Sequence, residues 1–103
     1  MILYNVTVKI DQQIEADWRE WMLGRHIPDI MQTGCFVSYK LCRIMGDDDQ
    51  YGVSYAVQYF APDLAAFELY RDEYAHQFQT EHAHRYKDQY VAFRTLMEVV
   101  QAG

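Results

Sequence analysis

Hydrophobic and polar residues alternate along four stretches of the chain, and this alternation predicts four β-strands. In residues 2–10 every second side chain is apolar, so one face of the strand collects Tyr4, Val6, Val8 and Ile10. The same two-residue period returns in three later stretches, at residues 35–45, 51–60 and 91–100. Alternation of this kind is typical of strands that bury one face against a core.

Two stretches between these strands follow the period of an amphipathic helix, from about residue 14 to residue 32 and from residue 62 to about residue 86. The polar segment 46–50, which reads GDDDQ, favours a hairpin between the second and third strands. The order β-α-β-β-α-β predicts an α+β fold of the ferredoxin-like type, a four-stranded antiparallel sheet with both helices on one face. A chain of 103 residues suits one domain, residues 1–103.

The first helical stretch contains a conflict. Its apolar residues before Gly24 lie on one side of an ideal helical wheel, and those after it lie on roughly the opposite side. Pro28 has no N–H for the Gly24 carbonyl, and its ring crowds that carbonyl. The sequence therefore predicts a kink or break between Gly24 and Ile27 that redirects the apolar face. Gly34 is expected to end this helix as a left-handed cap.

The charge of the chain limits its partners. A formal net charge of −6 argues against nucleic acid and against an anionic membrane as partners. No apolar run approaches the roughly 18 residues of a membrane span. We see no basic segment or cleavage site of a secretory signal, so a cytoplasmic protein is expected. Cys35 and Cys42 would lie on opposite faces of one strand and are expected to stay reduced.

The second face of the predicted sheet mixes polar and apolar side chains. Its expected polar members are Asn5, Thr7, Ser38, Lys40, Ser54, Gln58, Arg94 and Glu98. Its expected apolar members are Leu3, Phe36, Phe60, Leu96 and Val100. Such a face is either solvated or covered by a second copy of the chain, as in two-fold dimers whose identical patches pair. We favour a homodimer through this sheet face.

Several motifs taken together resemble a known family. They are Trp18-x-x-Trp21-Met22, His26-Ile27-Pro28, Met31-x-Thr33-Gly34-x-Phe36 and Phe93-Arg94-Thr95. They resemble the domain-of-unknown-function family numbered 4286, which consists of short uncharacterised bacterial proteins, and the resemblance covers essentially the whole chain. It implies a dimeric α+β barrel, in which two ferredoxin-like sheets pack face to face with the helices outside. That superfamily also includes antibiotic-biosynthesis-type monooxygenases without cofactors, small isomerases, haem enzymes and ligand-sensing domains, so the resemblance implies a fold and not a reaction.

His26 is the best single candidate for chemistry, because imidazole suits proton transfer near neutral pH and this residue lies at the predicted helix break. It could equally serve only to satisfy that break by hydrogen bonding. The residues expected to surround a flat organic ligand are Trp21, His26, Tyr39, Tyr55 and His82. The alternative is a core in which the tyrosine hydroxyls bond to the backbone or to each other. No metal-ligand motif is present, and neither a metal nor another cofactor is expected.

The sequence leaves two functions open. The first is a homodimer that binds a small ligand or has a structural role, and it is favoured because no complete catalytic set is present. The second is a small cofactor-independent enzyme of the monooxygenase or isomerase type, acting on an aromatic or polyketide-like compound. In that case His26 would transfer the proton, and Trp21 and Tyr55 would line the pocket.

Overall fold

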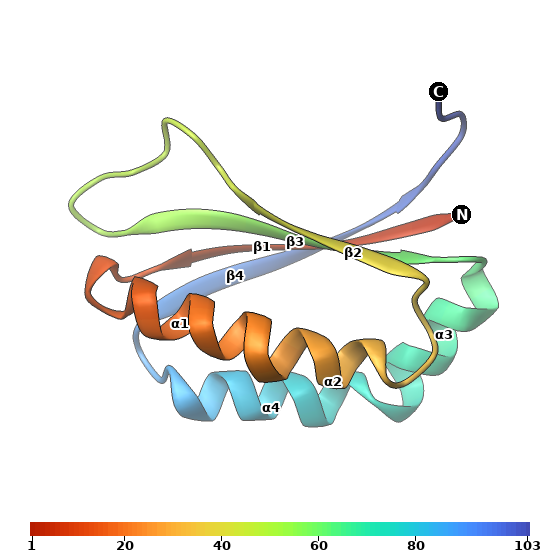
Figure 1. Cartoon of the computed structure of the whole chain (residues 1–103), viewed down its shortest axis with the longest axis horizontal. Helices are drawn as coiled ribbons and strands as arrows, with labels where there is room; N and C mark the ends of the chain where they lie inside the picture. Colours follow the sequence, from red (N-terminus) through yellow and green to blue (C-terminus); the bar gives the residue numbers. More distant parts are fainter.

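The computed structural model describes residues 1–103 and has the element order that the sequence predicts (Figure 1). The strands are β1 (Ile2–Ile10), β2 (Ser38–Arg43), β3 (Val53–Ala61) and β4 (Tyr90–Glu98). The helices are α1 (Glu15–Trp21), α2 (Ile27–Met31), α3 (Leu64–Glu73) and α4 (Ala75–Arg85). A short 3-10 turn (Gln12–Ile14) leads into α1, and a π-helical segment (Met22–His26) joins α1 to α2.

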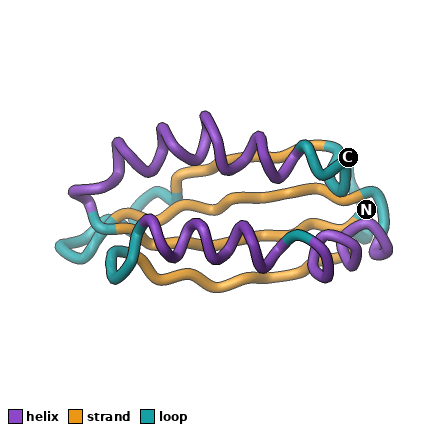
Figure 2. The backbone as a smooth tube through the Cα atoms, turned by 90° about the horizontal axis from the view of Figure 1, so that it is seen from below, coloured by secondary structure: helices purple, strands orange, loops and turns teal.

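The four strands form one antiparallel sheet with the order β2-β3-β1-β4. The helices lie in two rows over one face of this sheet, and Figure 2 shows both rows from below with the strands behind them. This arrangement confirms the predicted ferredoxin-like α+β fold. The other face of the sheet is not covered by any element of the chain (Figure 1).

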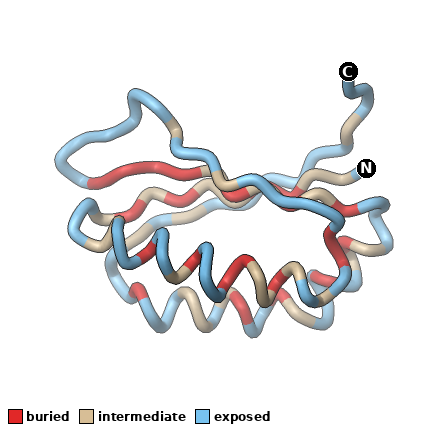
Figure 3. Tube along the Cα trace, in the orientation of Figure 1, coloured by how far each residue is buried: buried red, intermediate tan, exposed pale blue.

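The core lies between the helices and the sheet, where most of the buried residues gather (Figure 3). Its largest fully buried side chains come from both layers, and they are Trp18, Tyr55, Tyr59, Ile10, Ile27 and Val57. Aromatic rings provide much of the contact. The ring of Tyr4, for example, stacks on those of Phe36 and Tyr59 at centroid separations of 6.2 and 6.1 Å. The core is therefore unusually rich in tyrosine, which brings hydroxyl groups into an apolar layer.

The irregularity predicted before Pro28 is a π-helical turn rather than a break. The N–H of Ile27 donates to the carbonyl of Met22, five residues earlier, so the turn contains one extra residue. An extra residue rotates all later side chains by about 100° around the helix axis, which redirects the apolar face. Trp18 and Met22 before the turn and Ile30 after it are consequently all buried.

The end of α2 also agrees with the prediction that Gly34 caps this helix. Gly34 has a φ of +78°, the left-handed conformation expected of a helix cap. The hydroxyl of Thr33 donates to the carbonyl of Ile30 over 2.7 Å and helps to close the last turn. The strand expected from residue 35 begins only at Ser38, because the chain must first cross from the helix layer back to the sheet.

The second helical stretch, expected as one helix, is divided at Tyr74. The backbone of Tyr74 has a φ of −125° and a ψ of −34°, outside the helical range, and α4 starts with a new direction at Ala75. Asp63 caps the start of α3 by accepting a hydrogen bond from the N–H of Ala66 over 2.9 Å. The division allows α3 to cover one end of the sheet while α4 runs beside α1 and α2 (Figure 2).

The structure corrects the expected second face of the sheet in strand β4. Arg94 pairs with Val6 of β1, and paired residues share a face, so Arg94 lies on the helix side. Glu98 pairs with Ile2 and lies on the same side, so neither residue belongs to the open face, where both were expected together with Lys40. The open face of β4 instead carries Val91, Phe93, Thr95 and Met97. The sequence pattern misled because β4 is an edge strand with its more apolar face turned away from the helices.

Phe36 is a second correction to that face. It is buried between the layers, with ring centroids 5.2 Å from Tyr59 and 4.9 Å from Tyr70. Because it precedes β2, the alternation of the strand does not determine its direction.

Candidate functional site

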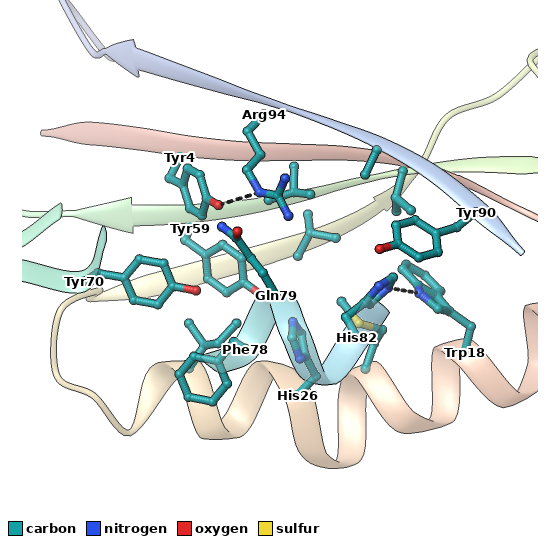
Figure 4. A pocket seen from close by; sticks show the side chains of 16 residues that line it. Tyr4, Trp18, His26, Tyr59, Tyr70, Phe78, Gln79, His82, Tyr90 and Arg94 are labelled. Carbon is teal, nitrogen blue, oxygen red and sulfur yellow. Dashed lines mark hydrogen bonds between the residues drawn. The ribbon is translucent and has the colours of Figure 1, made fainter. Parts of the chain in front are cut away.

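A cavity between the helix layer and the sheet lies at the edge formed by β4, and Figure 4 shows its principal side chains. Its walls come from β1, β3 and β4 on one side and from the α1–α2 segment and helices α3 and α4 on the other. The residues that line it are Tyr4, Val6, Val8, Trp18, Met22, His26, Ile30, Val57, Tyr59, Tyr70, Phe78, Gln79, His82, Tyr90, Ala92 and Arg94. The centres of water-sized molecules can occupy a volume of about 50 Å³ inside it. Since one water needs ~10–15 Å³ by this measure, it has room for a few waters or a small polar group.

His26 is the more buried of the two histidines of this cavity, with 8% of its surface exposed. The π-helical turn places it there, because His26 ends the turn and points toward the sheet (Figure 4). Its ring stacks on that of Trp21 with a centroid separation of 4.8 Å, and its Nδ1 atom is buried without a hydrogen-bond partner. Burial and, to a smaller extent, nearby His82 lower the pKa of His26 to about 3. The imidazole is therefore neutral at pH 7 and has an unsatisfied ring nitrogen.

His82 enters the cavity from α4, with a ring centroid 5.8 Å from that of His26. Its Nε2 accepts a 2.9 Å hydrogen bond from the indole N–H of Trp18. Burial is the main cause that lowers the pKa of His82 to about 4, and the charge of Arg94 adds to it. Both histidines are thus held in their neutral forms, and the Trp18 bond fixes the Nδ1-protonated tautomer of His82.

Arg94 is the cationic group of the cavity. It extends from β4, and its Nε donates a 3.1 Å hydrogen bond to the hydroxyl of Tyr4 (Figure 4). It has no carboxylate partner, whereas Arg43, Arg71 and Arg85 each form an ion pair. No Asp or Glu lines the cavity. In a chain of net charge −6 this cavity is therefore a local exception, with one unpaired cation and no acid.

The tyrosines of the cavity are hydrogen-bond donors. Burial raises the pKa of both Tyr59 and Tyr70, and neighbouring tyrosine hydroxyls add to both shifts. Their hydroxyls therefore remain protonated at any physiological pH. Together with the Gln79 amide they surround the cavity with neutral polar groups that can donate to a ligand (Figure 4).

Of the five pocket residues predicted from the sequence, the cavity brings together His26 and His82. Trp21 does not line it, but it covers the ring of His26 from outside. Tyr55 lies under Trp18, with ring centroids 4.9 Å apart, and its hydroxyl donates to Glu15 over 2.5 Å. Tyr39 is exposed on β2, at the opposite edge of the sheet from β4.

Sequence reasoning missed Arg94, Gln79, Tyr70 and Tyr90 as cavity residues. Arg94 was assigned to the wrong face, and Gln79 looks like an ordinary polar residue of a helix surface. One signal was available for Gln79, because it lies three residues before His82 and one after Phe78 and so borders the buried stripe of α4. The distance between the layers at the β4 edge has no signature in the sequence.

Nothing in the fold suggests a built metal site, since no three His, Cys, Asp or Glu side chains come together. Cys35 is buried and Cys42 is exposed, and both are free thiols. None of the helices has the combination of length and apolar character needed to cross a membrane.

Comparisons with solved structures find a similar fold in several proteins, some of which are described as dimeric ferredoxin-like proteins. SnoaB, a cofactor-independent oxygenase from Streptomyces nogalater, matches with a TM-score of 0.69 and 17% identity, over 98% of this chain and 95% of SnoaB. MhuD, solved with two manganese protoporphyrin IX molecules per active site, matches with a TM-score of 0.72 and 12% identity, over 100% and 98% of the two chains. A dimeric ferredoxin-like protein from an uncultured marine organism has a TM-score of 0.64 and 12% identity, over 99% and 97%.

At these identities the likeness is one of fold, and it does not extend to a reaction. No curated protein matches the sequence. The family comparison is more specific, because a single family matches residues 1–100. The chain thus belongs to the family described as Domain of unknown function (DUF4286), as its tryptophan, His-Ile-Pro and Thr-Gly motifs suggested.

Proposed function

We propose that this protein is a homodimer that binds a small organic ligand in the cavity around His26. The observation that carries the proposal is the buried, unpaired Nδ1 atom of His26. Buried polar atoms almost always have a partner, and each exception calls for an explanation such as strain, a catalytic role or a bound molecule or ion. A ligand group that bonds to this nitrogen would remove the cost of leaving it unpaired, which is about 1–3 kcal/mol.

The lining of the cavity supports the same proposal. Most of its residues are apolar or aromatic, and a few polar groups converge from different elements, namely His26, His82, Gln79 and Arg94. Such a combination is typical of small-ligand sites. Packing alone does not explain why two neutral histidines line a cavity at whose edge an exposed arginine has no acidic partner.

The open face of the sheet supports the homodimer. Phe93 is 63% exposed and Val91 69% exposed, and they lie beside Thr7 and Lys9 of β1. An edge strand with its apolar side chains turned to solvent normally has a partner. Three similar folds among the solved structures are described as dimeric ferredoxin-like proteins. A second copy of the chain is therefore the occupant that we propose for this face.

A small cofactor-independent enzyme is the second candidate, with His26 as the proton-transfer group. It is supported by the neutral imidazole facing a cavity and by the fold shared with a cofactor-independent oxygenase. With a pKa of about 3, however, His26 is a weak base. It would accept a substrate proton efficiently only if the bound molecule raised that pKa, as a nearby negative charge does. A porphyrin, as bound by MhuD, does not fit a cavity with room for a few waters.

The proposal is tested by screening small aromatic and aliphatic compounds, acids as well as neutral molecules, by thermal shift and by NMR of the His26 ring. Ala92→Leu fills the cavity from β4, and Ala83→Leu makes the same change on the exposed side of α4. We expect compounds that bind the parent and Ala83→Leu but not Ala92→Leu. Binding that Ala92→Leu leaves unchanged, or a screen without any compound that perturbs His26, would overturn the proposal.

A further inference from the structure

A second, larger cavity opens next to the first. It offers about 200 Å³ for the centres of water-sized molecules and is lined by Tyr4, Phe67, Tyr70, Arg71, Ala75, Gln79, Arg94 and Leu96. Tyr4, Tyr70, Gln79 and Arg94 line both cavities, so they form the boundary between them. Figure 4 shows these four side chains converging from β1, β4, α3 and α4. The inner cavity around His26 and the outer cavity are therefore two compartments with one shared wall.

The two compartments differ in size and chemistry. The inner one is small, with room for ~3–5 waters, and His26, His82 and tyrosine hydroxyls supply polar groups there. The outer one is several times larger, and the residues that belong to it alone are mostly apolar, as Phe67, Ala75 and Leu96 show. A molecule with a compact polar head and a bulkier apolar body would match this division.

The charged side chains around the boundary indicate that the polar head of the ligand is negatively charged. Arg94 has no acidic partner, and neither cavity is lined by an Asp or Glu. Arg71, the other cation of the outer cavity, is already paired with Asp72 at 2.8 Å and Glu68 at 3.8 Å. The positive charge available to a ligand is therefore that of Arg94. A guanidinium can hold a carboxylate through two parallel hydrogen bonds, and the Gln79 amide beside it can donate as well.

We propose that the ligand is a small organic monocarboxylate, with its carboxylate at Arg94 and Gln79 facing the inner cavity and its apolar body in the outer cavity. This inference rests on the proposed ligand-binding function and adds the chemical class of the ligand. The carboxylate has a size suited to the inner compartment. The body lies against Phe67, Ala75 and Leu96, on the side that opens at the edge of the sheet.

The arrangement has a consequence for His26. A carboxylate at Arg94 adds a negative charge near the two rings, beside the cation that now lowers the pKa of His82. Nearby negative charge favours protonated imidazole, so binding would raise the pKa of His26 from its present value of about 3. The bound anion would then turn a weak base into a stronger one.

The test compares acids with their amides, which have nearly the same shape but no charge. Phenylacetate and phenylacetamide, and hexanoate and hexanamide, are titrated into the parent, Arg94→Gln and Arg71→Gln by calorimetry and NMR. We expect each acid to bind the parent at least tenfold more tightly than its amide. Arg94→Gln should remove this preference, while Arg71→Gln, whose guanidinium already has acidic partners, should retain it.

The outcomes separate this inference from the proposed function. If amides and acids bind equally well and Arg94→Gln changes neither, the cavity binds ligands but not carboxylates, and only the inference fails. If none of the four compounds binds, the inference also fails, and the wider screen with Ala92→Leu decides the proposed function by itself. Arg94→Lys provides a check on folding, since it retains the charge and should retain part of the acid preference.

Discussion

The indole N–H of Trp18 donates a 2.9 Å hydrogen bond to Nε2 of His82 and so joins α1 to α4 beside the cavity (Figure 4). Because Nε2 accepts this hydrogen bond, it must be unprotonated, and the proton of the neutral ring lies on Nδ1. Protonation of His82 would break this bond, which agrees with the lowered pKa of its ring. The bond therefore fixes the position and the tautomer of a cavity residue.

Replacement of Trp18 by phenylalanine tests this relationship. Trp18→Phe removes the donor, leaves Nε2 of His82 without a partner and creates a void in a fully buried position. We expect a loss of about 2 kcal/mol or more in the free energy of unfolding, measured with urea. In NMR titrations the pKa of His82 should rise at the same time. Trp21→Phe, at a partly exposed position without this bond, should cost about 1 kcal/mol or less.

The acid sensitivity of the protein should depend on His26 and His82. The folded state lowers their pKa values from 6.5 to about 3 and about 4, so the unfolded chain binds more protons between these values. Their contribution to stability is complete above about pH 6.5 and declines as the pH falls toward the folded-state pKa values. The loss is on the order of a few kcal/mol, at about 1.4 kcal/mol for each unit of pKa difference.

Urea unfolding at pH 7.5 and pH 4.5 measures this effect. The His26→Gln/His82→Gln double variant should lose less stability between the two pH values than the parent. His76→Gln, at an exposed position of α4, should follow the parent. If the double variant and the parent lost equal amounts, the histidines would not be the source of acid sensitivity.

Much of the fold was predictable from the sequence because it depends on periodicity. The alternation in residues 2–10 and the helical spacing of Phe67, Tyr70, Tyr74 and Phe78 report burial directly. The strand forms as predicted, whereas the helical stretch is divided into α3 and α4 at Tyr74. The irregularity before Pro28 was also predictable, because proline chemistry is local. The sequence did not predict that this irregularity would be a π-helical turn, because a widened turn and a broken helix both satisfy the constraint that Pro28 imposes.

The site was less predictable, because it depends on which face of an edge strand meets the helices. In β4 the residues Phe93 and Met97 look like core but lie on the open face, while Arg94 lies on the helix side with its side chain still exposed. Intramolecular burial alone would favour the expected assignment. The need for an apolar face toward another molecule competes with it, and a single sequence does not reveal which requirement prevails.

Two glycines should respond oppositely to the same substitution. A Cβ at Gly24, in the π-helical turn, meets no atom within 4 Å, and this glycine has no left-handed φ. Gly24→Ala should therefore stabilise the protein by about 0.5–1 kcal/mol through helix propensity. At Gly52 the φ is +155°, and a Cβ would lie 2.1 Å from the carbonyl oxygen of Ile10, so Gly52→Ala should be strongly destabilising. Thermal unfolding of both variants checks this, and a destabilised Gly24→Ala would mean that the turn requires glycine.

Assembly through the open sheet face can be tested at Phe93. Val91, Phe93 and Met97 of β4 lie on the same face as Leu3 of β1 and Phe60 of β3. If a second copy covers this face, Phe93→Asp would bury a carboxylate from each copy without a partner, which is unfavourable. Light scattering after size-exclusion chromatography should give twice 12.3 kDa for the parent and about half that mass for Phe93→Asp.

A matched control is available on the helix side of the molecule. Leu69 of α3 is 52% exposed, close to the 63% of Phe93, but it lies on the layer that faces away from the proposed partner. Leu69→Asp should therefore remain dimeric. A parent of 12.3 kDa, or a Phe93→Asp variant with an unchanged mass, would contradict pairing through this face. Dissociation by Leu69→Asp alone would instead locate the contact on the helices, and the apolar face of β4 would then need another occupant.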